Sequence, residues 1–132
     1  MRVRTFRFLA LVATSAGFAA SAGAQTVPTD PETLVDASQA PETALPLARG
    51  QIAERDLLGA AGTLERLLLA RPGVIPARLL YASLLCRLDD AEGAGIELRL
   101  LDGQPIADAD WAEVTAACGN VARPAPPKGR RR

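Results

Sequence analysis

The chain has 132 residues, 48% of them apolar, and 15 basic side chains balance 15 acidic ones. A chain of this length holds at most one ordinary domain. It contains no histidine, which removes the commonest general base and most zinc sites. We therefore expect a binding or scaffolding protein that is not an enzyme and has no cofactor or metal.

The amino terminus has the pattern of a cleaved secretory signal. Three arginines give it a positive start, an apolar stretch runs on to Ala20, and Ala22-Gly23-Ala24 offers small residues for cleavage. The stretch is too short for a membrane-spanning helix, which needs about 20 apolar residues. We expect residues 1–24 to be removed, so that the mature chain begins at Gln25 in the periplasm or outside the cell.

Charge is distributed unevenly along the mature chain. Residues 25–122 hold seven basic and all 15 acidic side chains, a net charge near −8, whereas residues 123–132 hold five basic side chains. Such an acidic body is a poor partner for nucleic acid. The basic end could make weak contact with an anionic envelope surface, although a few charges on a disordered end usually remain solvated.

Both ends of the mature chain lack large apolar side chains. Residues 25–40 are rich in Pro, Thr and Asp, which predicts an extended lead-in with at most a short helical turn after Pro31. Residues 120–132 combine prolines with basic side chains, which predicts a disordered tail that is locally stiffened toward polyproline II. The folded domain is therefore expected to span residues 41–119.

Ala and Leu dominate this span and no run alternates with period two, so we predict an all-α fold. The third segment is apolar nearly all round, which places it in the middle of a stack. We expect helices from Pro41 to about Arg55, from Asp56 as N-cap to Arg71 before Pro72, from Pro76 through Leu88, from Asp90 as N-cap to Asp102-Gly103, and from Asp108 as N-cap to just before Gly119.

The first two helices resemble the next two when residues 41–74, the first unit, are laid over residues 75–108, the second unit. The matched pairs are Leu45 and Leu79, Ala48 and Ala82, Asp56 and Asp90, Gly59 and Gly93, Ala60 and Ala94, Leu64 and Leu98, and Leu67 and Leu101. Small side chains would let the helices of each hairpin approach, at Ala48 against Ala60 and at Ala82 against Ala94. The alternative is an ordinary antiparallel bundle with accidental periodicity.

With Pro72 near the end of the first unit, this pattern resembles the tetratricopeptide repeat, whose period is about 34 residues. The resemblance implies two antiparallel helix-turn-helix hairpins and a capping helix. The capping helix would continue the stack, because Ala48, Ala82 and Ala116 are each 34 residues apart. The early aromatic of the first helix is missing, except for Tyr81 one hairpin on. Pro105 lies one residue before the position that corresponds to Pro72, so the resemblance does not fix where the second unit ends.

A narrower resemblance covers Thr63–Pro72 and Ala77–Asp90. These runs are similar to the periplasmic repeat region of proteobacterial outer-membrane proteins related to the surface lipoprotein assembly modifiers. In that group, helical repeats precede a carboxyl-terminal β-barrel, which does not follow in this sequence. The resemblance therefore implies a stand-alone or truncated repeat module.

First helices of successive hairpins line the concave side of such a stack. By helical phase this side would carry Arg49, Ile52, Ser83, Cys86 and Arg87, and the arginines could pair with carboxylates of a partner peptide or helix. Two hairpins make a short groove, however. The simpler interpretation is that these residues are merely exposed or are covered by the lead-in.

Cys86 and Cys118 lie late in the third and fifth predicted helices, which run roughly parallel. We expect a disulfide, which would close a loop of about 30 residues and stabilise the fold by roughly 3 kcal/mol. The alternative is two buried thiols that fill space. The acidic clusters are explained as helix caps and first-turn residues rather than a cation site, and Trp111 is expected to hold the last helix against the stack.

These features favour an exported scaffold that mediates protein–protein contacts in the cell envelope. One alternative is a small structural envelope protein whose basic tail determines where it is located. Another is the amino-terminal part of a longer outer-membrane β-barrel protein.

Overall fold

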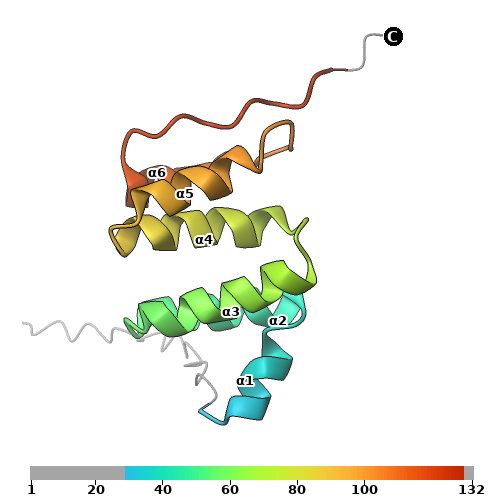
Figure 1. The fold of residues 1–132 in the computed structure, drawn as a ribbon, viewed down its shortest axis with the longest axis vertical. Helices are drawn as coiled ribbons and strands as arrows, with labels where there is room; N and C mark the ends of the chain where they lie inside the picture. The colour runs from blue at the N-terminus through green and yellow to red at the C-terminus, as the bar shows by residue number, and fades with distance from the viewer. Residues whose placement is uncertain (1–28, 130–132) are drawn as a thin grey trace, which may run out of the picture.

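The computed structural model of the protein describes residues 29–129. In this range it contains helices and no strand, which confirms the predicted all-α fold. The helices are α1 (Pro31–Ala37), α2 (Pro41–Ala53), α3 (Leu57–Ala70), α4 (Ile75–Arg87), α5 (Ala91–Arg99) and α6 (Asp108–Cys118). They are stacked with α1 at one end, α4 in the middle and α5 and α6 at the other end (Figure 1). The predicted signal segment 1–24, the start of the lead-in and the last three arginines lie outside the described residues.

Part of the predicted lead-in is a helix rather than an extended segment. Asp30 caps α1, because its carboxylate accepts hydrogen bonds from the Thr33 backbone N–H at 2.9 Å and from the Thr33 hydroxyl at 2.8 Å. These bonds favour the charged carboxylate and lower the pKa of Asp30. At the other end of α1, the buried Ser38 accepts a hydrogen bond from Arg66 of α3 at 2.9 Å. The lead-in therefore packs on the first hairpin through α1.

The chain leaves α2 and α4 through the same backbone turn, at equivalent positions of the two units. The turn of the first hairpin contains Arg55 in the left-handed region (φ 65°), and the N–H of the next residue, Asp56, donates to the Gln51 carbonyl at 2.8 Å. In the second hairpin Asp89 is left-handed (φ 62°), and Asp90 N–H donates to the carbonyl of the residue five positions earlier at 2.9 Å. This bond pattern satisfies carbonyls that a helix end would otherwise leave free.

The same turns start the second helix of each hairpin with the predicted caps. The carboxylate of Asp56 accepts from Gly59 N–H at 2.9 Å, and that of Asp90 accepts from Gly93 N–H at 2.8 Å. A Cβ at residue 59 would lie 2.0 Å from the Asp56 carboxylate, and one at residue 93 would lie 2.3 Å from that of Asp90. A side chain at either position would therefore require the capping carboxylate to shift.

Two clusters of buried apolar side chains form the core, and α4 contributes to both. The first lies between α2, α3 and α4 and contains Ala44, Ala48, Ala60, Ala61, Leu64, Leu67, Leu68, Ala77, Leu80 and Leu84. The second lies between α4, α5 and α6 and contains Leu79, Ala82, Ala94, Leu98, Leu101 and Val114. The central position predicted for the third segment is therefore confirmed, since α4 packs against α3, α5 and α6.

The four alanines that the repeat places where helices approach are all buried, as are the large side chains that follow them. A buried hydrogen bond adds to the first hairpin, in which the Thr63 hydroxyl donates to the Gln51 side-chain oxygen at 2.8 Å. The two hairpins do not meet in the way that two neighbouring pairs of a long stack would. α2 packs closely on α3 but makes little contact with α4, so α3 carries most of the contact between the halves.

Helix boundaries follow the predictions within a few residues, with one different cap. α2 ends at Ala53, and α5 ends at Arg99, slightly before the predicted end. The N-cap of α6 is Ala107, not Asp108, and no side chain caps this helix. The Asp108 carboxylate binds Arg123 at 2.8 Å instead. In the part of the chain that the structure describes, no helix combines the length and apolar character needed to cross a membrane.

The first part of the predicted disordered tail is packed on the body. Besides the Arg123 contact with Asp108, the Ala125 backbone N–H donates to the Asp102 carboxylate at 3.0 Å. The prediction of disorder from residue 120 is therefore corrected for this stretch. Its partners lie 15 to 23 residues earlier in the chain, so local composition did not reveal them.

Candidate binding face

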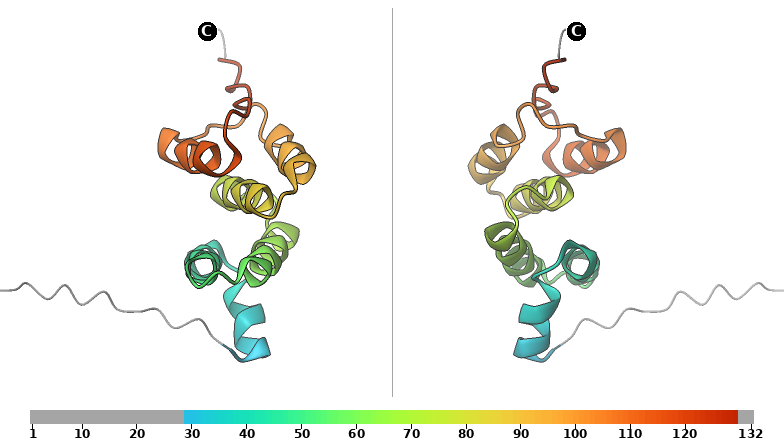
Figure 2. Two further views of the ribbon diagram at one scale, coloured as in Figure 1. Left: turned by 90° about the vertical axis from the view of Figure 1, so that its left-hand side faces the viewer. Right: turned by 90° about the vertical axis from the view of Figure 1, so that its right-hand side faces the viewer.

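α2 and α6 lie toward one side of the stack and α3 and α5 toward the other, with α4 in the middle, where it borders both sides (Figure 2). We call the first side the α2–α4–α6 face. The prediction assigned the possible partner-binding residues to these first helices. Arg49 and Ile52 lie on α2, whereas Ser83 and Arg87 lie on the central α4, so their individual surroundings decide which of them a partner could reach.

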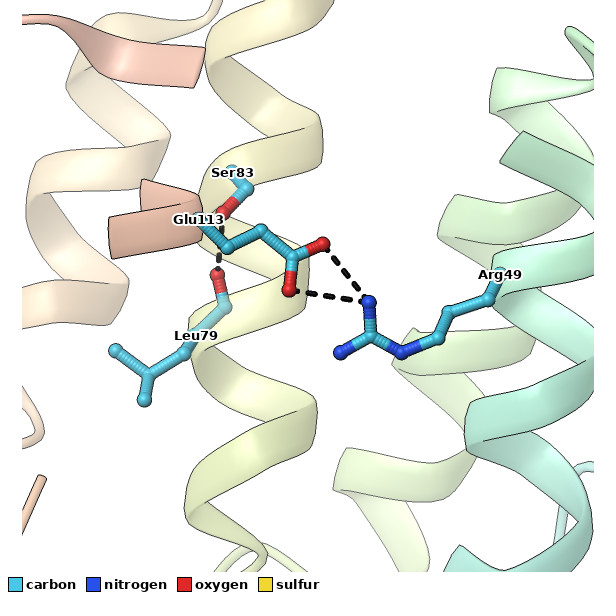
Figure 3. A network of polar contacts seen from close by, with 4 residues as sticks. All are labelled: Arg49, Leu79, Ser83 and Glu113. Carbon is cyan, nitrogen blue, oxygen red and sulfur yellow. Dashed lines mark hydrogen bonds and ion pairs between the residues drawn. The ribbon is translucent and has the colours of Figure 1, made fainter. Parts of the chain in front are cut away.

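Arg49 already has a partner within the chain. Its guanidinium donates hydrogen bonds to both carboxylate oxygens of Glu113, at 2.9 and 3.0 Å, and so joins α2 to α6 (Figure 3). The Arg49 side chain is 49% exposed and that of Glu113 is 29% exposed. Water and salt therefore weaken this pair, which contributes at most about 1 kcal/mol.

The sequence offered a weak signal for Glu113. With an offset of 34 residues, the position of Arg49 corresponds to Ser83 in the second unit and to Ala117 in the last helix. Glu113 lies one helical turn before Ala117. Glu113 therefore falls on the same face as Arg49. Sequence reasoning treated it only as a residue near the start of the last helix, because no local pattern indicates a partner 64 residues away.

Ser83 is not free to bind a partner, and Ile52 is only partly accessible. Ser83 is buried, and its hydroxyl donates to the Leu79 carbonyl of its own helix at 3.0 Å (Figure 3). Ile52 is half-buried and packs against the first core cluster. Both residues were predicted as candidates on the concave side. The central position of α4 buries Ser83, whereas the close packing of α2 on α3 leaves Ile52 only partly accessible.

Arg87 is the second predicted cation, and it is accessible as well. It is the last residue of α4, one turn after Ser83, and its side chain is exposed. Among residues 29–129, no ion pair involves Arg87. Its charge lies at the carboxyl end of a helix, where a cation interacts favourably with the helix dipole. Arg87 is thus free to meet an anionic group.

Cys86 and Cys118 form the predicted disulfide. Their Cα atoms are 5.2 Å apart, and the bond links the end of α4 to the end of α6 across 32 residues of sequence. Both cysteines also contribute partly buried surface to the second core cluster. Within the described range, His, Cys, Asp and Glu side chains form no group of three that could hold a metal ion.

A second set of polar contacts, which the sequence did not indicate, ties α3, α4 and α5 together. The Tyr81 hydroxyl donates to Glu65 at 2.5 Å, and burial together with this bond raises the pKa of Tyr81. Arg78 pairs with Glu97 and also donates to the Pro72 carbonyl at 2.8 Å. Because each side chain already has a partner, this cluster is best explained as part of the packing between helices.

Comparison with models of protein families, with curated proteins and with solved structures gives no match to this chain.

Proposed function

We propose that this chain is a short tetratricopeptide-like module that binds a partner protein outside the cytoplasm. The observation that supports this proposal is the recurrence of one hairpin. The left-handed residue, the aspartate cap, the glycine after it and the buried alanines all recur at equivalent positions of the two units. In repeat proteins the first helices of stacked hairpins line one face, which serves protein recognition. In this chain α3 rather than α2 joins the first hairpin to α4, so the corresponding face has α2 and α6 on either side of α4.

The proposed partner carries carboxylates and approaches the α2–α4–α6 face. Arg87 is exposed, and Arg49 can exchange its bond to Glu113 for a bond to an incoming carboxylate because the pair is partly solvated. Guanidinium groups bind carboxylates through two parallel hydrogen bonds, which gives such contacts direction as well as charge. The face therefore suits an acidic extended segment or an acidic helix.

The compartment is part of the proposal. The signal-like pattern of residues 1–24 supports export. The disulfide between Cys86 and Cys118 supports it independently, because stable disulfides belong to oxidising compartments.

Site-specific photo-crosslinking in the native host tests the binding face. A photoreactive residue at position 87 should cross-link to another protein, and Arg49→Glu should reduce that product several-fold. The matched control is a photoreactive residue at position 71, because Arg71 is exposed in the loop between α3 and α4. Equal cross-linking from both positions would contradict the proposal. Loss of the product only when Lys128 and the following arginines are replaced would instead favour a protein located by its tail.

A further inference from the structure

The tail segment, residues 121–125, follows a defined path over the end of the stack. Gly119 has a left-handed backbone (φ 70°) just past α6 and turns the chain back. α5 and α6 each pack on α4 but make little contact with each other. The tail passes between α5 and α6 in both views of Figure 2, and it runs along their outer side in Figure 1. Val121 packs there against the second core cluster.

Arg123 occupies a site that three groups of the body form. Its guanidinium donates to the Asp108 carboxylate at 2.8 Å and to the Ile106 carbonyl at 2.8 Å. It also lies over the ring of Trp111, 5.9 Å from the ring centre. An aromatic face, a carboxylate and a carbonyl together suit an arginine better than a lysine, because the flat guanidinium can stack and donate in two directions at once.

Two residues further on, the body holds the backbone of Ala125 rather than its side chain. The Ala125 N–H donates to the Asp102 carboxylate at 3.0 Å, and the Ala125 carbonyl accepts from the Gly103 N–H at 2.9 Å. Pairing both the donor and the acceptor of one residue is how proteins hold extended peptides without selecting every side chain. This contact fixes the direction and register of the segment.

A cleft of about 410 Å³ lies between the tail segment and α5, and tail residues 121–124 form one of its walls. Its lining combines apolar side chains such as Ala94, Leu98 and Val121 with the Asp102 carboxylate and the disulfide cysteines. Asp108, which binds Arg123 directly, provides the negative charge that balances this arginine. The geometry thus contains an apolar anchor point, an arginine site and a backbone clamp in order.

We propose that the surface of α5 and α6 under the tail, together with the adjoining cleft, is a peptide-binding site, which the chain's own tail covers. Its ligand in trans is an extended segment of another protein that carries an apolar residue, an arginine two positions later and an unpaired backbone N–H and carbonyl two positions after that. This ligand binds by displacing residues 121–125. The site is separate from the contact of Arg49 with Glu113 and does not depend on a partner at the α2–α4–α6 face.

The test uses the intact disulfide-bonded chain and a synthetic peptide with the sequence of residues 121–128. Arg123→Glu removes the stacking and places a carboxylate beside Asp108, so it should free the site. Lys128→Glu is the matched control, because it makes the same change of charge at an exposed tail residue. Binding is read from the fluorescence of Trp111, which is the single tryptophan of the chain.

The Arg123→Glu chain should bind the peptide saturably, and Arg123→Ala should do the same. The wild-type and Lys128→Glu chains should bind it at least about tenfold more weakly, since a short tether gives the tail an effective concentration of roughly millimolar. A peptide with alanine in place of its arginine should lose binding to every chain. Equal affinity for the wild-type and Arg123→Glu chains, or no saturable binding to either Arg123 variant, would overturn the proposal. Concentration-dependent dimers of the wild-type chain that Arg123→Glu abolishes would assign the site to the tail of a second copy instead.

Discussion

Removing the disulfide by Cys86→Ala with Cys118→Ala should strongly destabilise the fold. The bond closes a loop across 32 residues of sequence, and the loss of chain entropy in the unfolded state then corresponds to roughly 3–4 kcal/mol at 25 °C. A domain of about 100 residues has a total stability of about 5–15 kcal/mol, so this loss is a large fraction of the whole. The effect should be greatest in α6, whose one fully buried side chain is Val114.

Urea unfolding followed by circular dichroism measures this change. The oxidised wild-type chain should have a higher midpoint than the double alanine variant by the amount that corresponds to roughly 3–4 kcal/mol. Reductant should lower the wild-type midpoint toward that of the variant and leave the variant unchanged. Hydrogen exchange should show α6 losing protection before α3. A difference below about 1 kcal/mol would refute the reasoning, because packing alone would then hold α6 in place.

Three further predictions concern single positions. Leu64→Ala should lower the free energy of unfolding by about 2–5 kcal/mol in urea melts, because Leu64 is fully buried. Leu69→Ala on the same helix should change it by less than about 0.5 kcal/mol, because Leu69 is 85% exposed. Similar values for the two variants would contradict this difference in burial. Arg55→Gly and Asp89→Gly should each stabilise the chain by up to about 1 kcal/mol, because glycine removes the cost of a left-handed backbone, and a lower thermal midpoint for both would count against the turn geometry. The raised pKa of Tyr81 keeps its hydroxyl protonated in the folded chain at pH values where the unfolded chain ionises, so stability should be unaffected below pH 10 and fall above it. Absorbance titration at alkaline pH checks this directly, since Tyr81 is the one tyrosine of the chain, and ionisation at the usual pH would disprove it.

Local signals were sufficient to predict the helices and the recurrence of the hairpin. Asp56 and Asp90 indicated two helix starts because an N-cap acts on an amide only three residues away. The disulfide followed from two cysteines at the ends of parallel helices. The helix after Asp30 was underestimated, although its cap and Pro31 were also local signals.

The surroundings of the candidate site could not be read in the same way. The bond between Arg49 and Glu113 spans 64 residues, and the docking of Arg123 depends on how a loop and a helix end meet in space. Ser83 has the polarity of a surface residue, but its hydroxyl is satisfied by its own helix and can therefore be buried. Each of these outcomes depends on tertiary contacts that helical phase does not contain.

The position of α4 has a consequence for how the molecule comes apart. Its side chains complete both core clusters, so neither the α2–α3 pair nor the α5–α6 pair retains a closed interior once α4 is lost. Long solenoids can fray one unit at a time from their ends. Here the whole stack should melt in a single cooperative transition, and a proteolytic nick at Pro72-Gly73 should leave two fragments of which the first cannot fold without the second.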